Sequence, residues 1–224
     1  MSNILDNLNP VQREAVTTTE GPLLIVAGAG SGKTTVLVNR IAYIIDQGKA
    51  APYNILALTF TNKAANEMKE RIAALLPGLS GDMWIGTFHS ICVKILRRNI
   101  DFLGYTNDFV IYDTADVKTI MKECYRELDI DDRNFPVRSV MSIISGAKND
   151  SLDAETFESV YKTDFRMSEV AKIYKLYQSK LRKNNAVDFD DLILNTVKLL
   201  SLNPDVLEKY QRRFKYILVD EYQD

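Results

Sequence analysis

The sequence is poor in the residues that build metal sites and disulfides. Its 224 residues include two cysteines and a single histidine. Cys92 and Cys124 lie far apart and lack metal-ligand spacing, so we expect neither a zinc site nor a disulfide. Thiols without partners are typical of a reducing compartment.

Long apolar segments are also absent. The N-terminus has no basic region followed by an apolar stretch, and nowhere does an apolar run approach the roughly 18 residues that a membrane-spanning helix needs. We therefore expect a cytoplasmic protein that makes no contact with a membrane.

The chain has no strong excess of charge of either sign. Its formal net charge is -2 and its pI is near 5.6, so any contact with nucleic acid must be local. One basic stretch, residues 162–183, holds seven basic side chains against Asp164 and Glu169. These are Lys162, Arg166, Lys172, Lys175, Lys180, Arg182 and Lys183. A solvated helix face and a phosphate-contacting face both remain open interpretations.

Short apolar runs alternate with helical patterns in the first hundred residues. The runs occupy residues 23–27, 54–60 and 83–88, and apolar residues recur at helical spacing over 36–45 and 65–75. A further run, residues 216–219, is apolar enough for a strand buried on both faces. The order predicts an α/β fold with a parallel sheet and crossover helices.

From about Asn107 the pattern becomes helical, which predicts an all-helical insertion. One helix begins near Asp113 or Thr114, a second runs from Val137 to Ile144 before Gly146, and a third runs from Ser168 to Leu181. A further helix covers residues 188–200. Cys124 falls on the apolar face of the first of these helices, and we expect both it and Trp84 in the core.

The strongest chemical signal is a phosphate-binding loop between a predicted strand and a predicted helix. It reads Ala27, Gly28, Ala29, Gly30, Ser31, Gly32, Lys33, Thr34. Such glycines let backbone N–H groups surround phosphates, the lysine reaches the β and γ phosphates, and the threonine ligates Mg²⁺. Ala27 replaces the first glycine of the strict pattern, although the remaining glycines supply the flexibility. A plain turn would not require Gly-Lys-Thr at this position, so we expect a nucleotide such as ATP to bind.

An acidic pair supplies the second element of this chemistry. Asp220 and Glu221 follow the apolar run 216–219, at the strand end where open α/β sheets bind ligands. An isolated pair of this kind is usually solvated surface. Beside a phosphate loop, Asp220 is expected to hold Mg²⁺ through water, and Glu221 to polarise the attacking water.

Six ordered motifs together resemble the superfamily-one DNA helicases of the PcrA, UvrD and Rep kind. They span nearly the whole chain: LNP with Gln12, AGAGSGKT at 27–34, TFTNKAANEM at 59–68, GTFHS at 86–90, VDFDDL at 187–192, and DEYQD at 220–224. The resemblance implies that Gln12 recognises adenine and that Phe60, Thr61, Asn62, Thr87, His89 and Phe189 contact single-stranded DNA.

Without the resemblance, several of these residues have plainer interpretations. Gln12 would be a surface residue, Phe60 a core residue and His89 a structural histidine. The carboxylates around Phe189 would include a helix cap. Thr35 departs from many relatives, which carry arginine there, and nucleotide affinity is expected to be lower as a result.

The resemblance implies a RecA-like P-loop domain, incomplete at its C-terminus, formed by residues 1–107 and 187–224. The helical subdomain would cover 108–186. The parent would be an ATP- and Mg²⁺-dependent helicase acting in repair or replication, moving 3′ to 5′ on single-stranded DNA and meeting duplex junctions. Its arginine fingers, worth about three to five orders of magnitude in rate, would lie in a second RecA-like domain, so this fragment is expected to be nearly inactive.

Three other interpretations stay open on sequence grounds. The chain could be the helicase part of a helicase-nuclease, which shares these motifs. It could also be a module that binds nucleotide or DNA without turnover. An unrelated P-loop kinase or transporter ATPase is disfavoured, because such proteins do not need TFTNKAA and GTFHS between their two nucleotide motifs.

Overall fold

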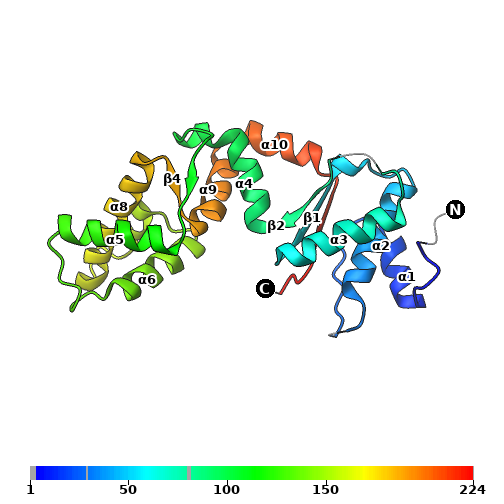
Figure 1. Cartoon of the computed structure of the whole chain (residues 1–224), viewed down its shortest axis with the longest axis horizontal. Helices are drawn as coiled ribbons and strands as arrows, with labels where there is room; N and C mark the ends of the chain where they lie inside the picture. Colours follow the sequence, from blue (N-terminus) through cyan, green and yellow to red (C-terminus); the bar gives the residue numbers. More distant parts are fainter. Residues whose placement is uncertain (1–3, 29, 80–81, 224) are drawn as a thin grey trace. The chain divides into compact units, whose positions relative to one another are not determined.

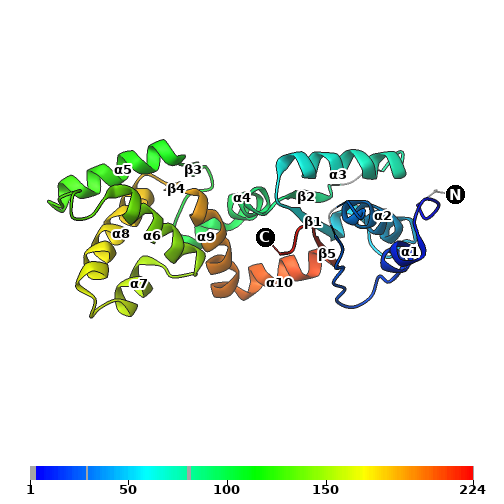
Figure 2. The same ribbon diagram turned by 90° about the horizontal axis from the view of Figure 1, so that it is seen from below.

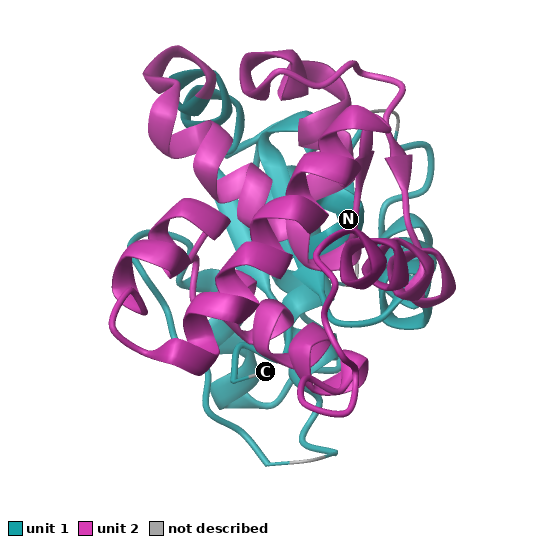
Figure 3. Cartoon of the chain, turned by 90° about the vertical axis from the view of Figure 1, so that its left-hand side faces the viewer, with its two compact units in different colours: residues 1–91, 207–224 teal, residues 92–206 magenta. Residues whose placement is uncertain are grey.

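The computed structural model describes residues 4–28, 30–79 and 82–223, and it divides the chain into two compact units. The first unit comprises residues 1–91 and 207–224, and the second comprises residues 92–206 (Figure 3). Each has its own hydrophobic core. The two units are defined by how densely their residues contact one another, which does not test where a domain begins or ends. The expected domain limits at 107/108 and 186/187 therefore stay a prediction.

The first unit is built on a three-stranded parallel sheet in the order β2-β1-β5 (Figure 1). The strands are β1 (Ile55–Thr59), β2 (Trp84–Thr87) and β5 (Tyr216–Val219). Its helices are α1 (Pro10–Thr17), α2 (Lys33–Asp46) and α3 (Asn62–Leu75), with the short 3-10 helix η1 (Pro52–Asn54). Helices α4 (Phe88–Asn99) and α10 (Pro204–Arg213) cross the limits between the two units.

Alternation along β1 sends side chains to both faces of the sheet. Ile55 and Ala57 join a core with α2 and α3, in which Ile41, Met68 and Leu218 are also buried. On the other face, fully buried Trp84 packs at ring distances of 5.2 Å from Phe214 and 6.1 Å from Tyr210. The expectation that Trp84 is a core residue is confirmed.

The second unit is mainly helical, and α5, α6, α7 and α8 pack into one cluster (Figure 2). Its elements are η2 (Ile100–Leu103), β3 (Val110–Ile111), α5 (Thr114–Glu127), α6 (Val137–Asn149), α7 (Ala154–Val160), α8 (Phe165–Lys183), β4 (Ala186–Val187) and α9 (Phe189–Leu202). Tyr174, Tyr177 and Ile173 of α8 are buried at the centre of this core, and Cys124 is also in it, as expected.

Two predictions about sheets are wrong. Residues 23–27 form no strand, and Leu24 and Val26 are 69% and 87% exposed. Strand β5 forms, but it is not buried on both faces, because Ile217 is 61% exposed and Leu218 is the one buried residue of the strand. Both errors share a cause: an apolar run shows that a segment can be buried, but does not supply the neighbouring strand that would cover it.

The prediction of an all-helical insertion is also wrong in part. β3 and β4 pair in parallel, with Val110 opposite Ala186 and Ile111 opposite Val187. Helix α6 continues through Gly146 to Asn149, and α8 begins at Phe165, capped by Asp164, rather than at Ser168. α5 begins after an Asp113 cap, as predicted.

Among the described residues, no helix is both long and apolar enough to cross a membrane.

Candidate nucleotide and DNA site

The carboxyl ends of the three parallel strands gather most of the predicted site residues of the first unit. Thr59 is paired with Thr87 across β1 and β2, so Phe60 and Phe88 leave the sheet at the same end. The backbone N–H of Asp220 donates to Leu58 at 2.8 Å, which places the end of β5 alongside them. This edge is where ligands bind in open α/β sheets.

The predicted phosphate loop leads directly into α2. Gly32 is the N-cap of this helix with φ +86°, and Gly30 has φ +74°, both in the left-handed region that favours glycine. Ser31 donates both its backbone N–H and its hydroxyl to the carbonyl of Gly28, at 3.3 and 2.6 Å. Within the described residues no side chain caps α2, so the N–H groups of its first turn are available to an anion. Ala29, also predicted to bind nucleotide, lies outside the described residues.

Lys33 and Thr34 open α2 beside the end of β5. The ammonium of Lys33 donates to the Ala27 carbonyl at 3.3 Å, which folds its side chain back over the loop. The Thr34 hydroxyl donates to Asp220 Oδ2 at 3.4 Å. Loop and acidic strand end therefore meet, as the predicted ATP and Mg²⁺ roles of these residues require.

Asp220 is buried, with 8% of the residue exposed. Burial is the main cause that raises its pKa above the ordinary 3.8, followed by the charge of Glu221. The backbone N–H of Glu221 donates to Asp220 Oδ1 at 3.2 Å, and together with Thr34 and Lys33 it opposes that rise in pKa. A buried acceptor-rich carboxyl next to a hydroxyl is well suited to take up a cation.

Glu221 adopts φ +53°, so the chain turns out of its strand conformation immediately after Asp220. Its carboxylate accepts a hydrogen bond from Gln223 Nε2 at 2.6 Å. That arrangement places the group at the strand end without bringing it against Lys33 or Thr34. Its role in activating water remains a prediction.

Gln12 lies against the phosphate loop, although 19 positions separate it from Ser31. Its Nε2 donates to the Ser31 carbonyl at 3.0 Å, and its Oε1 accepts from the backbone N–H of Asn9 at 3.1 Å, closing a capping box at the start of α1. An amide can form about four hydrogen bonds, so each atom has capacity for another partner such as a base edge. Thr35 is half-buried nearby, with its carbonyl bonded to Asn39 at 2.7 Å.

Phe60 is 60% exposed, so the interpretation of this residue as core is wrong. It directly precedes Thr61, whose hydroxyl caps α3 by accepting from the backbone N–H of Ala64 at 3.1 Å. Asn62 is exposed at the first position of that helix. An exposed ring beside polar groups at a helix N-terminus suits stacking on a base and hydrogen bonding to phosphate.

The end of β2 also places a threonine and an exposed phenylalanine at the start of a helix. Thr87 accepts the backbone N–H of Ser90 at 3.2 Å through its side chain, and His89 is half-buried on the following turn. Phe88 is 39% exposed and was missed by the sequence analysis. The signal was present, because both β1 and β2 end at a threonine that a phenylalanine directly follows.

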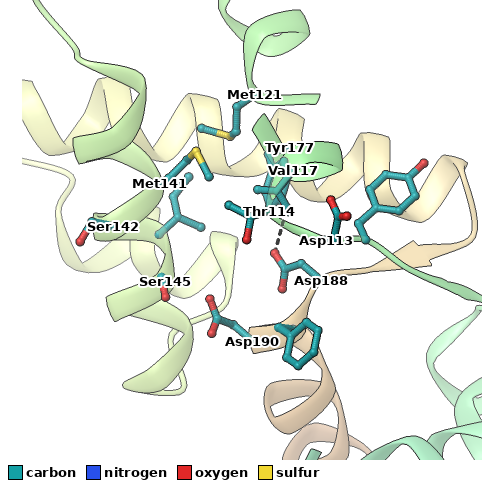
Figure 4. A pocket seen from close by; sticks show the side chains of 13 residues that line it. Asp113, Thr114, Val117, Met121, Met141, Ser142, Ser145, Tyr177, Asp188 and Asp190 are labelled. Carbon is teal, nitrogen blue, oxygen red and sulfur yellow. Dashed lines mark hydrogen bonds between the residues drawn. The ribbon is translucent and has the colours of Figure 1, made fainter. Parts of the chain in front are cut away.

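Phe189 belongs to the second unit, where it is 57% exposed at the first position of α9. Asp188 before it is the N-cap, as its interpretation as a helix cap predicted. Asp188 also accepts the Tyr177 hydroxyl at 2.6 Å, drawn as the dashed line in Figure 4. Both of these residues and Phe189 line a pocket of about 310 Å³, whose lining also includes Met121, Met141 and Ser145 (Figure 4).

Three of the seven basic residues in the stretch 162–183 form ion pairs with glutamates. Lys172 lies 2.6 Å from Glu169, Lys175 lies 2.8 Å from Glu158, and Lys180 lies 2.8 Å from Glu127. Paired lysines contribute less positive potential than the sequence count indicates. This finding favours the solvated helix face over the phosphate-contacting face.

Residues 8–224 match the family described as UvrD/REP helicase N-terminal domain. The chain belongs to this family. It is 52% identical over 223 residues to "ATP-dependent DNA helicase PcrA" of Bacillus subtilis (strain 168), and 49% identical over 224 residues to the PcrA of Staphylococcus aureus (strain Mu50 / ATCC 700699). Each match covers 100% of this chain and 30% of the relative.

A third relative, the PcrA of Staphylococcus epidermidis (strain ATCC 35984), is 49% identical, and the chain covers 31% of it. The chain thus spans about a third of the length of these UvrD/REP relatives. The family resemblance read from the six motifs is confirmed. The match runs through both compact units, so the mainly helical second unit is part of the family pattern.

Proposed function

We propose that the chain is the nucleotide-binding and single-stranded-DNA-binding N-terminal portion of an ATP-dependent DNA helicase, with a RecA-like P-loop fold. The observation that carries the proposal is the 3.4 Å approach of the Thr34 hydroxyl to Asp220, two groups 186 positions apart in sequence. This contact joins the start of the phosphate-loop helix to the acidic end of a parallel strand, the layout that phosphoryl transfer needs.

In this proposal the loop from Ala27 to Gly32 receives the ATP phosphates. Backbone N–H groups of the first turn of α2 would donate to phosphate oxygens, with the positive end of the helix dipole behind them. Lys33 would exchange the Ala27 carbonyl for the β and γ phosphates, because a charged acceptor is stronger than a carbonyl. Gln12 would use its remaining amide capacity on the adenine edge.

The donor set fits magnesium. Thr34 and Asp220 offer two neighbouring oxygen atoms, and Mg²⁺ is usually held by one or two protein oxygens together with water and substrate phosphates. Among the described residues no group of three or more His, Cys, Asp or Glu side chains could form a complete cage. Bound magnesium would neutralise charge developing on the phosphates. Glu221 would accept a hydrogen bond from the attacking water and orient it.

We propose slow hydrolysis for these 224 residues alone. By the resemblance, the arginines that stabilise phosphoryl transfer belong to a second RecA-like domain of the parent, and such residues contribute about three to five orders of magnitude. Turnover that appears only when the remainder of the parent is supplied would distinguish this proposal from a binding module without chemistry. The parent would move 3′ to 5′ on single-stranded DNA toward duplex junctions, in cytoplasmic repair or replication.

We propose DNA contact for the aromatic side chains that leave the carboxyl end of the sheet, Phe60 and Phe88, and for the polar Thr61, Asn62, Thr87 and His89 that neighbour them in sequence. Phe189, an exposed ring of the second unit, is proposed as a further stacking residue. Loss of one base–aromatic stack costs about 1–3 kcal/mol. We expect Phe60→Ala to weaken binding of a single-stranded oligonucleotide by about 5- to 150-fold in fluorescence anisotropy.

Tyr53→Ala provides a matched control for this test. Tyr53 is an exposed aromatic residue in η1, before β1, and therefore at the opposite end of the same strand. The Tyr53→Ala variant should bind DNA like the wild type. Equal losses in the two variants, or no loss in either, would contradict the placement of DNA at the carboxyl end of the sheet.

A further inference from the structure

A buried lysine contacts the two carboxylates that flank the exposed Phe189 in sequence. Lys148 of α6 is 3% exposed, and its ammonium lies 2.5 Å from Asp188 Oδ2 and 2.8 Å from Asp191 Oδ1. The Tyr177 hydroxyl donates to the same oxygen of Asp188 at 2.6 Å, and Gln178 Nε2 donates to Asp191 Oδ1 at 2.9 Å. These five residues are called here the Lys148 network, and all of them lie in the second unit.

The two carboxylates of the network also build the cap of α9. Asp188 Oδ1 accepts from the backbone N–H of Asp191 at 2.8 Å, and Asp191 Oδ2 accepts from the backbone N–H of Asp188 at 3.1 Å. Each carboxylate therefore gives one oxygen to the helix cap and the other to Lys148. Phe189 and Asp190 are the only residues between them in sequence, so the lysine holds the backbone on both sides of the exposed ring.

Stability alone does not account for this arrangement. A buried ion pair is often no more stabilising than well-packed apolar residues of similar volume, because desolvation opposes the attraction between the charges. What such a network supplies is a defined geometry, since each charged group must keep its partners in place. Burial lowers the pKa of Lys148, but the adjacent Asp191 and Asp188 outweigh it, so the ammonium stays charged.

We propose that Lys148 is a positioning residue: by holding Asp188 and Asp191 it fixes the first turn of α9, so that Phe189 is presented to single-stranded DNA as a preorganised stacking surface. The inference rests on the proposed function, because it requires that Phe189 stacks on a base. An ordered aromatic residue avoids the entropic cost of arranging itself when it binds. Tyr177 assists by holding Asp188 from α8.

The test is a double-mutant cycle in the full chain, using an oligonucleotide that carries 2-aminopurine, whose emission is quenched by stacking. Lys148→Met keeps much of the side-chain volume and removes the charge. Phe189→Ala removes the ring. We expect each to weaken DNA binding by about 5- to 150-fold, the range for one base–aromatic stack, and to abolish quenching. In the Phe189→Ala background, Lys148→Met should change binding by less than about twofold.

Two further variants keep the test decisive. Lys198→Met removes another lysine of an ion pair, 2.9 Å from Asp153 and on α9 itself, and should leave quenching unchanged. Where Lys148→Met loses its helical circular dichroism, Tyr177→Phe replaces it in the cycle, because it removes only the hydroxyl that donates to Asp188. We expect it to reduce quenching in the same direction.

The outcomes distinguish the DNA contact of Phe189 from the positioning role of Lys148. If Phe189→Ala binds DNA like the wild type, the assignment of Phe189 to DNA fails, and the positioning role fails with it. If Phe189→Ala binds weakly while the effects of Lys148 and Phe189 simply add, the positioning role alone is overturned. Unchanged quenching in a folded Lys148→Met variant also overturns it.

Discussion

At the scale of single residues, the carboxylate of Asp220 is expected to bind either a proton or Mg²⁺. The residue is 8% exposed, its carboxylate lies 3.4 Å from the Thr34 hydroxyl, and burial together with the charge of Glu221 raises its pKa above 3.8. A cation binds the deprotonated form, so protons and Mg²⁺ compete for the same oxygens. In the metal-free protein, the raised pKa also means that folding favours the protonated carboxyl.

This competition predicts opposite pH trends for binding and for stability. Affinity for Mg²⁺–nucleotide should fall as pH is lowered toward the raised pKa of Asp220. The carboxyl contributes stability below its unfolded pKa of 3.8, and that contribution is lost as pH rises through the folded pKa. The metal-free Asp220→Asn variant should therefore melt no lower than the wild type at neutral pH, with the difference shrinking in acid.

Calorimetric melting and nucleotide titration over a pH series measure both trends. Asp220→Asn should bind Mg²⁺–nucleotide weakly at every pH, whereas Glu14→Gln, an exposed carboxyl of α1, should follow the wild type. A marked destabilisation of metal-free Asp220→Asn at neutral pH would show that the carboxylate is held by favourable contacts instead.

At the scale of elements, the apolar segment 23–27 has the sequence pattern of a strand but does not form one. β1 already has β2 on one side and β5 on the other, and the sheet hydrogen bonds of the described residues do not include 23–27. Leu24 and Val26 are consequently exposed. The phosphate loop is instead held by Gln12, Lys33 and the start of α2.

Glutamate substitutions test this placement. Val26→Glu should change the free energy of unfolding by no more than about 0.5 kcal/mol, as is usual at exposed positions. Leu218→Glu should cost more than about 3 kcal/mol, because Leu218 is 6% exposed in the core and the charge would be buried without a partner. Urea denaturation measures both, and comparable losses would mean that residues 23–27 are packed in a sheet.

The same scale shows what local patterns can and cannot predict. β1, β2, α3 and α5 with its Asp113 cap follow from residue spacing and capping chemistry, which are local. β3 and β4 have two residues each, which is too short for the alternation of apolar and polar residues that identifies a strand in a sequence. Phe60 was misread because its apolar run continues beyond the buried strand.

Contacts between distant residues lie beyond any local pattern. The motifs predicted a common role for the phosphate loop and the acidic pair, but the contact between Thr34 and Asp220 came only with the structure. Lys148 and Asp188 are 40 positions apart, and nothing near Lys148 in the sequence indicates a buried network. Phe88, by contrast, could have been found from the threonine that directly precedes it, as one precedes Phe60.

At the scale of the whole molecule, neither sign of charge is in strong excess, and ion pairs neutralise part of the basic stretch of α8. The net charge is -2, and the basic stretch of α8 faces glutamates of α5, α7 and α8 itself. Long-range attraction to phosphate is therefore weak over this surface. DNA contact is expected at the aromatic positions that the proposed function names.

Charge reversal in α8 tests this distribution. Because Lys172 and Lys175 are paired with Glu169 and Glu158, the double variant Lys172→Glu/Lys175→Glu should leave the salt dependence of duplex-junction binding nearly unchanged. The slope of log affinity against log salt is the measurement. A slope that flattens by about 1 to 2 would assign these lysines to phosphate contacts and restore the alternative interpretation.

The central claim is that the loop at 27–34 and Asp220 form one nucleotide site, and titration of the chain with a fluorescent ATP analogue tests it most directly. The wild type should bind saturably, and more tightly with Mg²⁺ than without. Lys33→Ala should lose binding. Lys49→Ala should retain it, because Lys49 lies just after α2 and is paired with Glu20. Equal binding by wild type and Lys33→Ala, or affinity indifferent to Mg²⁺, would contradict the account.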